Sequence, residues 1–121
     1  MNEWHPKIWG AEQWLVQTEL YTCKILWLEP DFQCSLHRHL VKDETFRVLS
    51  GEVKLEIGDE VRLLRAGDSV RVPPGTWHRF ANHRYGVVAQ ILEVSTHHDE
   101  TDVERREPSR RTSGAGAEIG G

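Results

Sequence analysis

The chain has few cysteines, no long hydrophobic run and no excess of positive charge. Its two cysteines, Cys23 and Cys34, form no CxxC pair and are too few for a disulfide framework, so we expect both to be reduced and structural. No run of about 18 apolar residues is present, which excludes a transmembrane helix. The formal net charge of -4 gives no general attraction to nucleic acid or to anionic membranes.

The N-terminus also lacks the features of a secretory signal peptide. The segment MNEWHPKIWG is neither basic enough nor apolar enough for one, and we therefore expect a cytoplasmic protein. The length of 121 residues fits one domain. A domain of this size buries roughly two-thirds of its unfolded surface, which is enough for a single core without disulfides.

Helical periodicity is absent before residue 97, and short strand-like segments take its place. Val53, Leu55 and Ile57 alternate with polar residues, which puts them on one face of a strand. Turn signals such as Ser50-Gly51 and Pro73-Pro74-Gly75 recur about every 8 to 12 residues. This spacing predicts an all-β sandwich or barrel.

We divide the chain into three parts. Residues 1–13 contain the breakers Pro6 and Gly10 among tryptophans and predict an irregular arm that packs aromatic side chains onto the body. Residues 14–96 hold the strands of the barrel. Residues 97–121 form a charged and then Gly-rich tail, in which we expect a short helical turn over 101–106 and disorder over 112–121. Its acidic residues interleave with arginines, which argues against a nucleic-acid patch.

One short stretch, SLHRHLVKDE, concentrates metal-binding side chains. On a strand, His37 and His39 share a face, and Glu44 follows across a short loop. His78 comes after the tight turn at residues 73–75 and offers a further ligand from another strand. This set suits a divalent transition metal. The alternative is four polar residues that hydrogen-bond in the core, which is a costly arrangement for three imidazoles and a carboxylate.

These residues fill two sequence motifs, and through them the chain resembles the cupins. The motif G(X)5HXH(X)3-4E(X)6G is matched up to Gly51, except that Asp31 stands at the leading glycine. Asp tolerates the left-handed turn geometry better than most residues do. The motif G(X)5PXG(X)2H(X)3N is matched at every defined position from Gly67 to Asn82.

The resemblance implies a small single-domain cupin, which is a jelly-roll-like barrel of two antiparallel sheets, also called a double-stranded β-helix. By resemblance the ligands of one divalent metal are His37, His39, Glu44 and His78. Mn, Fe, Co, Ni and Zn all suit such ligands, and the sequence does not rank them. Many small cupins dimerise through edge strands, so we expect a homodimer with the Trp-rich N-terminal arm at the contact.

A finer resemblance points to sugar-isomerase cupins. KIWGAEQWL near the start and ILEVSTHHDETDVERR near the end are similar to type II phosphomannose isomerase domains, and Lys42 holds the place of a lysine that precedes the metal glutamate in D-lyxose isomerases. The phosphomannose enzymes typically also carry a nucleotidyltransferase domain, which this sequence does not contain, and the lyxose isomerases are longer. The resemblance implies a carbohydrate-like small-molecule substrate and an aldose–ketose isomerase or an epimerase.

A proton-transfer route needs an acid or base that is not a metal ligand. Lys42 and Glu93 are our candidate catalytic residues by position, and Arg47 is a further one. Glu93 lies in the apolar strand VVAQILEV, where a charge is unexpected; its alternative is a residue at the rim or on the outer face. The alternative for Lys42 is a solvated loop lysine.

Three other polar residues invite a role near the metal. Arg79 suits a substrate hydroxyl or phosphate, but alternation from His78 turns it outward. We reject His97 and His98 as a second metal site, because adjacent strand residues point in opposite directions.

Two other functions use the same four ligands. One is an Fe-dependent dioxygenase-type cupin, and the other is a non-catalytic metal- or sugar-binding module. The fold does not decide among them, since cupins host many chemistries. An isomerase works without oxygen, a dioxygenase consumes it, and a binding module binds sugar without turnover.

Overall fold

The computed structural model describes residues 2–112, which form thirteen β-strands and no helix. The all-β prediction is confirmed. This part of the chain accordingly offers no helix with the length and apolar character needed to cross a bilayer. The disorder that we expected over residues 112–121 falls, apart from Thr112, outside the described residues.

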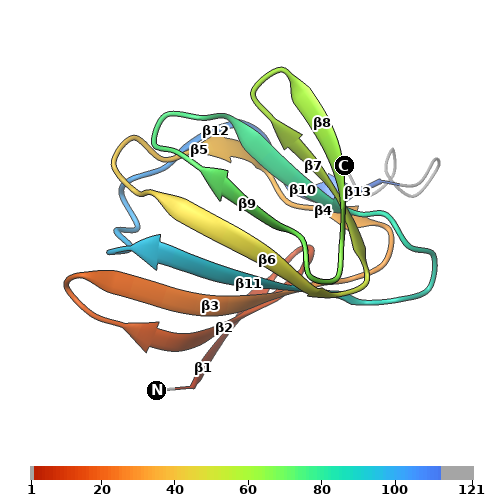
Figure 1. The fold of residues 1–121 in the computed structure, drawn as a ribbon, viewed down its shortest axis with the longest axis horizontal. Helices are drawn as coiled ribbons and strands as arrows, with labels where there is room; N and C mark the ends of the chain where they lie inside the picture. The colour runs from red at the N-terminus through yellow and green to blue at the C-terminus, as the bar shows by residue number, and fades with distance from the viewer. Residues whose placement is uncertain (1, 113–121) are drawn as a thin grey trace.

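The strands form two antiparallel sheets that face each other as two layers (Figure 1). The first sheet has six strands, in the spatial order β1 (Glu3–Lys7), β2 (Gly10–Gln17), β3 (Tyr21–Leu28), β11 (Ala89–Thr96), β6 (Glu44–Ser50) and β9 (Ser69–Val72). The second has seven: β12 (Glu104–Glu107), β5 (Leu36–Arg38), β10 (His78–Asn82), β4 (Phe32–Gln33) and β13 (Arg110–Arg111), with β7 (Glu52–Ile57) on β10 and β8 (Glu60–Arg65) on β7.

The core lies between the two sheets and follows the alternation of the strands. On β7 the inward residues Val53, Leu55 and Ile57 are buried, as their spacing predicts. Phe46 of β6 and Phe80 of β10 meet edge to face across the interior, with ring centroids 4.7 Å apart. Each fully buried side chain of this size contributes roughly 1.5–3 kcal/mol through the hydrophobic effect.

The backbone conformations at Asp31 and Gly51 explain why the motifs have glycine at these two positions. Asp31 has a φ of 66°, so it adopts the left-handed conformation that we expected at the place of the motif glycine. Gly51, with a φ of 84°, leads from β6 to β7. A Cβ there would lie 3.0 Å from the Cα of Ala89, so both the backbone angle and the close approach favour glycine.

The irregular conformation that we predicted for the N-terminal arm is wrong. Residues 3–7 form β1, which pairs with β2 at the edge of the six-stranded sheet. Pro6 is tolerated because an edge strand leaves one side of its backbone unpaired. Trp4 packs against Trp27 of the same chain, with ring centroids 5.9 Å apart, and remains 52% exposed. The homodimer contact at this segment stays a prediction.

The helical turn that we predicted over residues 101–106 is also wrong. A turn closed by the hydrogen bond from Asp102 N–H to the Asp99 carbonyl is followed by β12, which pairs with β5. The sequence ERRE carries no apolar alternation, so it gives no strand signal of its own. Its backbone pairs with the free edge of β5, and the Glu104 carboxylate accepts two hydrogen bonds from Arg38, at 3.0 and 3.1 Å.

Candidate metal centre

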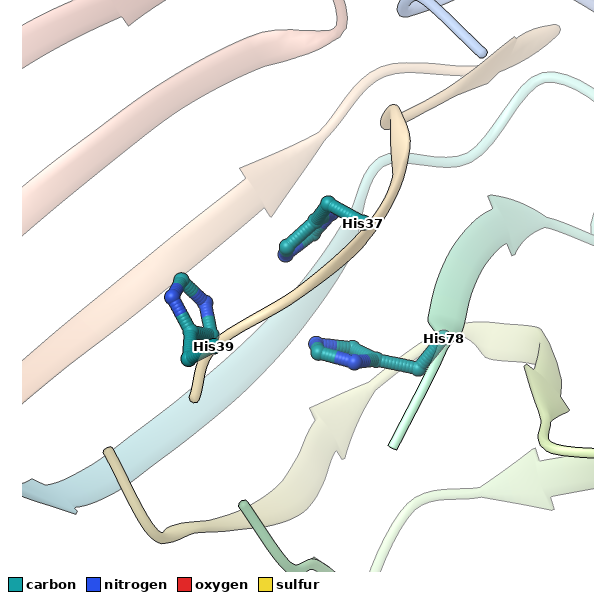
Figure 2. A group of neighbouring side chains, drawn as sticks. All are labelled: His37, His39 and His78. Carbon is teal, nitrogen blue, oxygen red and sulfur yellow. The ribbon is translucent and has the colours of Figure 1, made fainter. Parts of the chain in front are cut away.

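Three histidines converge inside the barrel. His37 lies on β5, His39 follows that strand directly, and His78 begins β10 opposite His37. One ring nitrogen from each lies within 4.8 Å of the others. Figure 2 shows the three rings turned toward a common point. A period of two along β5 and the cross-strand pair with β10 therefore produce the cluster.

Backbone carbonyls fix the orientation of all three rings. His37 Nδ1 lies 2.8 Å from the Ser35 carbonyl oxygen, His78 Nδ1 lies 2.9 Å from that of Thr76, and His39 Nδ1 lies 2.6 Å from that of Asp102. A carbonyl only accepts hydrogen bonds, so each ring carries its proton on Nδ1. The lone pair on Nε2 is then free for a metal, which is the usual arrangement of histidine ligands.

Glu44 stands beside this cluster on β6. Its Oε2 lies 3.3 Å from His78 Nε2, and its Oε1 lies 3.6 Å from His39 Nε2. The side chain is 3% exposed, and Oε2 has no hydrogen-bond donor among residues 2–112. A buried carboxylate oxygen without a donor is unfavourable. A divalent cation among the three Nε2 atoms would remove this penalty, so the four residues fit a metal.

The electrostatics favour the protonation states that metal binding requires. Burial lowers the pKa of His37 from 6.5 to about 3 and keeps its ring neutral. Burial would raise the pKa of Glu44, but the charge of the Lys42 ammonium beside it prevails and holds the pKa below its ordinary value. Neutral imidazoles and an ionised carboxylate are the ligand forms of these groups.

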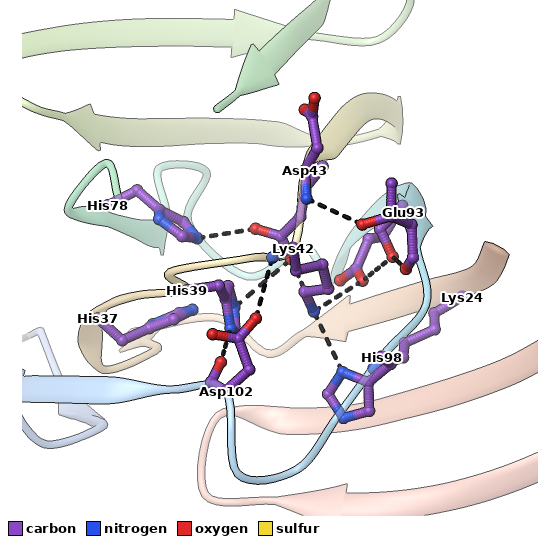
Figure 3. A network of polar contacts seen from close by, with 12 residues as sticks. Lys24, His37, His39, Lys42, Asp43, His78, Glu93, His98 and Asp102 are labelled. Carbon is purple, nitrogen blue, oxygen red and sulfur yellow. Dashed lines mark hydrogen bonds and ion pairs between the residues drawn. The ribbon is translucent and has the colours of Figure 1, made fainter. Parts of the chain in front are cut away.

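Lys42 and Glu93 both lie inside the barrel (Figure 3). Lys42 Nζ is 2.9 Å from Glu44 Oε1, 3.4 Å from Glu93 Oε2 and 3.2 Å from His98 Nδ1. Burial opposes the charge on Lys42, but Glu93 and Glu44 outweigh it and raise its pKa. Burial raises the pKa of Glu93 in spite of Lys42. Lys42 is therefore no solvated loop residue, and Glu93 is no residue of the outer face.

Asp102 holds the loop that connects the histidines to Glu44. Its carboxylate accepts hydrogen bonds from the backbone N–H groups of Leu40, Val41 and Lys42, at 2.8–3.2 Å. Its own carbonyl accepts the Nδ1–H of His39. Sequence reasoning missed this residue, because DETD in a charged segment has the composition of a solvated tail.

The remaining candidates lie away from the cluster. Arg47 is exposed on the outer side of β6. Arg79 faces outward as expected, and its guanidinium donates to Glu56 and Glu107. His97 and His98 point in different directions, which agrees with our rejection of a second metal site. His97 Nδ1 hydrogen-bonds the Thr18 carbonyl, whereas His98 contacts Lys42.

The histidines open into a cavity of about 340 Å³ that extends well beyond them. Sequence reasoning missed several of its polar lining residues, among them Glu12, Lys24 and His98. Lys24 of β3 is only 2% exposed and lies opposite Glu93 in the sheet register. The alternation along LYTCKILWLE is a signal that can place Lys24 inward with Leu26 and Leu28.

Comparison with known proteins settles the family. The family model described as "Cupin domain" matches residues 25–95, which is more than half of the chain. The chain belongs to the cupin family, as its two motifs predicted.

Several curated relatives have carbohydrate-related names. The chain is 32% identical over 89 residues to mannose-1-phosphate guanylyltransferase 2 of Escherichia coli, which covers 73% of this chain and 18% of that protein. It is 25% identical over 99 residues to a mannose-1-phosphate guanylyltransferase of Sinorhizobium fredii, which covers 79% of this chain and 19% of that protein. The chain thus spans less than a fifth of the length of these relatives.

A solved structure supports the fold. The crystal structure of an RmlC-like cupin from Shewanella frigidimarina matches with a TM-score of 0.71 and 20% identity. The match covers 83% of this chain and 87% of that one. At this identity the likeness shows the fold alone, and it agrees with the jelly-roll-like barrel that we expected.

Proposed function

We propose that this protein is a metal-dependent isomerase or epimerase that acts on a sugar or sugar phosphate. The observation that carries the proposal is the buried contact between Lys42 and Glu93, 3.4 Å apart, in the cavity that the three histidines line. It supplies an acid/base pair that is separate from the histidines, which proton transfer between adjacent sugar carbons requires.

The metal would be held by His37, His39, His78 and Glu44. A bound divalent cation supplies Lewis acidity, because it polarises a carbonyl and orients two adjacent substrate oxygens. Mn, Fe, Co, Ni and Zn all suit three imidazoles and a carboxylate.

The proton is moved by this chain's own groups. In the proposed reaction the Glu93 carboxylate removes the proton from the carbon next to the carbonyl and returns it to the former carbonyl carbon, while the hydroxyl proton passes from its oxygen to the adjacent former carbonyl oxygen. Its raised pKa fits a group that must both accept and release a proton. The Lys42 ammonium stays charged between Glu44 and Glu93 and stabilises the negative charge that develops on the substrate.

The relatives support a carbohydrate substrate. Two of them are named for mannose 1-phosphate, which is a hexose phosphate. The cavity volume of about 340 Å³ is at the lower end of small-molecule sites and suits a single sugar.

An anaerobic substrate screen in D₂O tests the proposal. The protein is loaded in turn with Mn, Fe, Co, Ni and Zn and offered aldoses, ketoses and their phosphates. We expect interconversion of one pair, with solvent deuterium in the product. Oxygen uptake with Fe would instead indicate the dioxygenase, and sugar binding without turnover would indicate a binding module; either result refutes the isomerase.

Variants at the acid/base pair identify the groups involved. Lys42→Met and Glu93→Gln should each lower kcat by about 10²–10⁴-fold while metal is retained, because general acid–base catalysis is worth that much. Lys54→Met, at an exposed position of β7, is the matched control and should keep full kcat.

A further inference from the structure

A second polar cluster, formed by Glu12, Lys24 and His98, lies in the cavity outside the histidine cluster. The Lys24 side chain is 2% exposed, and its Nζ lies 3.4 Å from Glu12 Oε1 and 4.4 Å from the centre of the Trp14 ring. No other hydrogen-bond acceptor reaches this ammonium within residues 2–112. Figure 3 shows Lys24 beside His98 on the far side of Lys42 from the metal centre.

This ammonium is incompletely paired for a buried charge. Ion-paired hydrogen bonds of this kind are normally 2.7–2.9 Å long, and an ammonium has three donors. Lys24 uses one donor, at 3.4 Å. A buried charge is costly unless it is well paired. Lys24 therefore offers donors to a ligand in the cavity that it lines.

The Glu12 carboxylate offers the matching acceptors. It accepts a 2.9 Å hydrogen bond from the Trp14 indole. Burial would raise the pKa of Glu12, but Lys24 and this hydrogen bond hold it below its ordinary value, so the carboxylate is ionised. An ammonium and a carboxylate side by side bind a diol well, because each hydroxyl both donates and accepts.

The charges around this cluster disfavour a phosphate. The lining of the cavity there includes the ammonium groups of Lys7 and Lys24, and the carboxylates of Glu12, Asp99 and Glu100. His98 adds no charge, since its Nδ1 accepts a hydrogen bond from Lys42. Lys42, which contacts His98, and Glu93, which contacts Lys42, add one charge of each sign. Four carboxylates then face three ammonium groups, so a dianion meets no net positive charge.

We propose that Glu12 and Lys24 bind hydroxyl groups of an unphosphorylated sugar whose carbonyl end lies at the three histidines. The inference rests on the proposed function and narrows its substrate class to neutral sugars. Arg105 of β12 also lines the cavity, opposite His37 in the register, and no carboxylate pairs with it within residues 2–112. Phosphate binding at Arg105 is the competing arrangement.

The test is equilibrium binding to the Mn-loaded full chain, measured by titration calorimetry. The ligands are D-mannose, D-fructose and the 6-phosphate of each. The wild type is compared with Lys24→Met, Glu12→Gln and the exposed control Lys54→Met. Chelator competition measures metal affinity separately, and thermal unfolding checks that each variant is folded.

We expect the neutral sugars to bind more tightly than their phosphates. Lys24→Met should raise their Kd by about tenfold, because a hydrogen bond to a charged group is lost. Glu12→Gln removes a negative charge, so it should weaken the neutral sugars and tighten the phosphates. A merely structural ion pair would not give this crossover at unchanged metal affinity. The crossover is measured on Glu12→Gln, so it can be tested even if Lys24→Met does not fold.

Failure of the subsite and failure of the proposed function give different results. Tighter binding of the phosphates by the wild type, or unchanged Kd values in both variants, overturns the subsite and leaves the isomerase standing. The expected binding pattern without turnover overturns the isomerase and leaves the subsite standing. No binding of any of the four ligands overturns the subsite outright.

Discussion

The two ends of the barrel interior are built on the same strands but hold opposite kinds of side chain. At one end the inward residues of β3, β6 and β11 are Leu28, Val48 and Ala89; at the other they are Lys24, Glu44 and Glu93, and all six are at most 4% exposed. The alternation of the strands continues unchanged from one end to the other. The apolar end therefore supplies the stability that lets charged groups be buried at the polar end.

A deletion in the apolar core should have a large effect on stability and little on the site. Leu55 is 0% exposed and does not line the cavity. We expect Leu55→Ala to lower the free energy of unfolding by about 2–5 kcal/mol. Urea denaturation measures this, and chelator competition should give an unchanged metal affinity for the folded variant. A parallel loss of metal affinity would show that the two ends are not separable.

Removing a histidine at the polar end should instead weaken metal binding. His78→Gln deletes a nitrogen of the cluster, and we expect metal affinity to fall by more than about 100-fold, since even outer partners of a site are worth 10–100-fold. The exposed His83 provides the matched control, and His83→Gln should bind metal as the wild type does. Equal affinities in the two variants would rule His78 out as a ligand.

A substitution of Asp102 tests whether the polar end of the barrel depends on residues beyond 25–95, the range that the cupin family model matches. Asp102→Ala removes the acceptor for the N–H groups of residues 40–42, and we expect metal affinity to fall by about 10–100-fold. Amide hydrogen exchange at residues 40–42 should speed up in the same variant. The exposed Asp59→Ala serves as control. Faster exchange with wild-type metal affinity would limit Asp102 to a role in loop order.

The last prediction is a pH dependence of the metal-free protein. The folded state keeps His37 neutral down to about pH 3, whereas the unfolded chain takes up a proton near pH 6.5. Protons therefore favour the unfolded state, and stability should fall as the pH drops from 6.5 toward 3. Urea denaturation at a series of pH values, in the presence of a chelator, measures the slope. His37→Gln should reduce the slope of stability against pH. An identical slope in the variant would contradict the assignment of this pH dependence to His37.

The cluster was predictable because its signals are local. His37 and His39 follow from the period of two along a strand, and a defined turn precedes His78. The inward position of Glu93 also follows from alternation, but sequence alone did not distinguish it from a residue at the rim. The contact with Lys42 that decides the matter joins residues 51 positions apart.

The rest depends on pairings between distant segments. The edge of β5 that receives β12 exists only in the folded barrel, so nothing in ERRE itself predicts a strand. The charged composition of DETDVERR is compatible with a solvated tail and with a segment docked on the barrel, so it does not distinguish the two. In the same way, the edge position of β1 makes Pro6 acceptable, and this position is not visible in the sequence.

The hydrogen bond between His39 and Asp102 joins residues 63 positions apart. During synthesis, the ribosome adds all but the last few strands of the barrel before this partner of the imidazole exists. Non-local contacts of this kind form late, because closing a long loop costs entropy before any contact compensates for it. A nascent chain that has not reached residue 102 consequently lacks the acceptor that orients the His39 ring, and we expect it to bind a cation more weakly than the finished chain does.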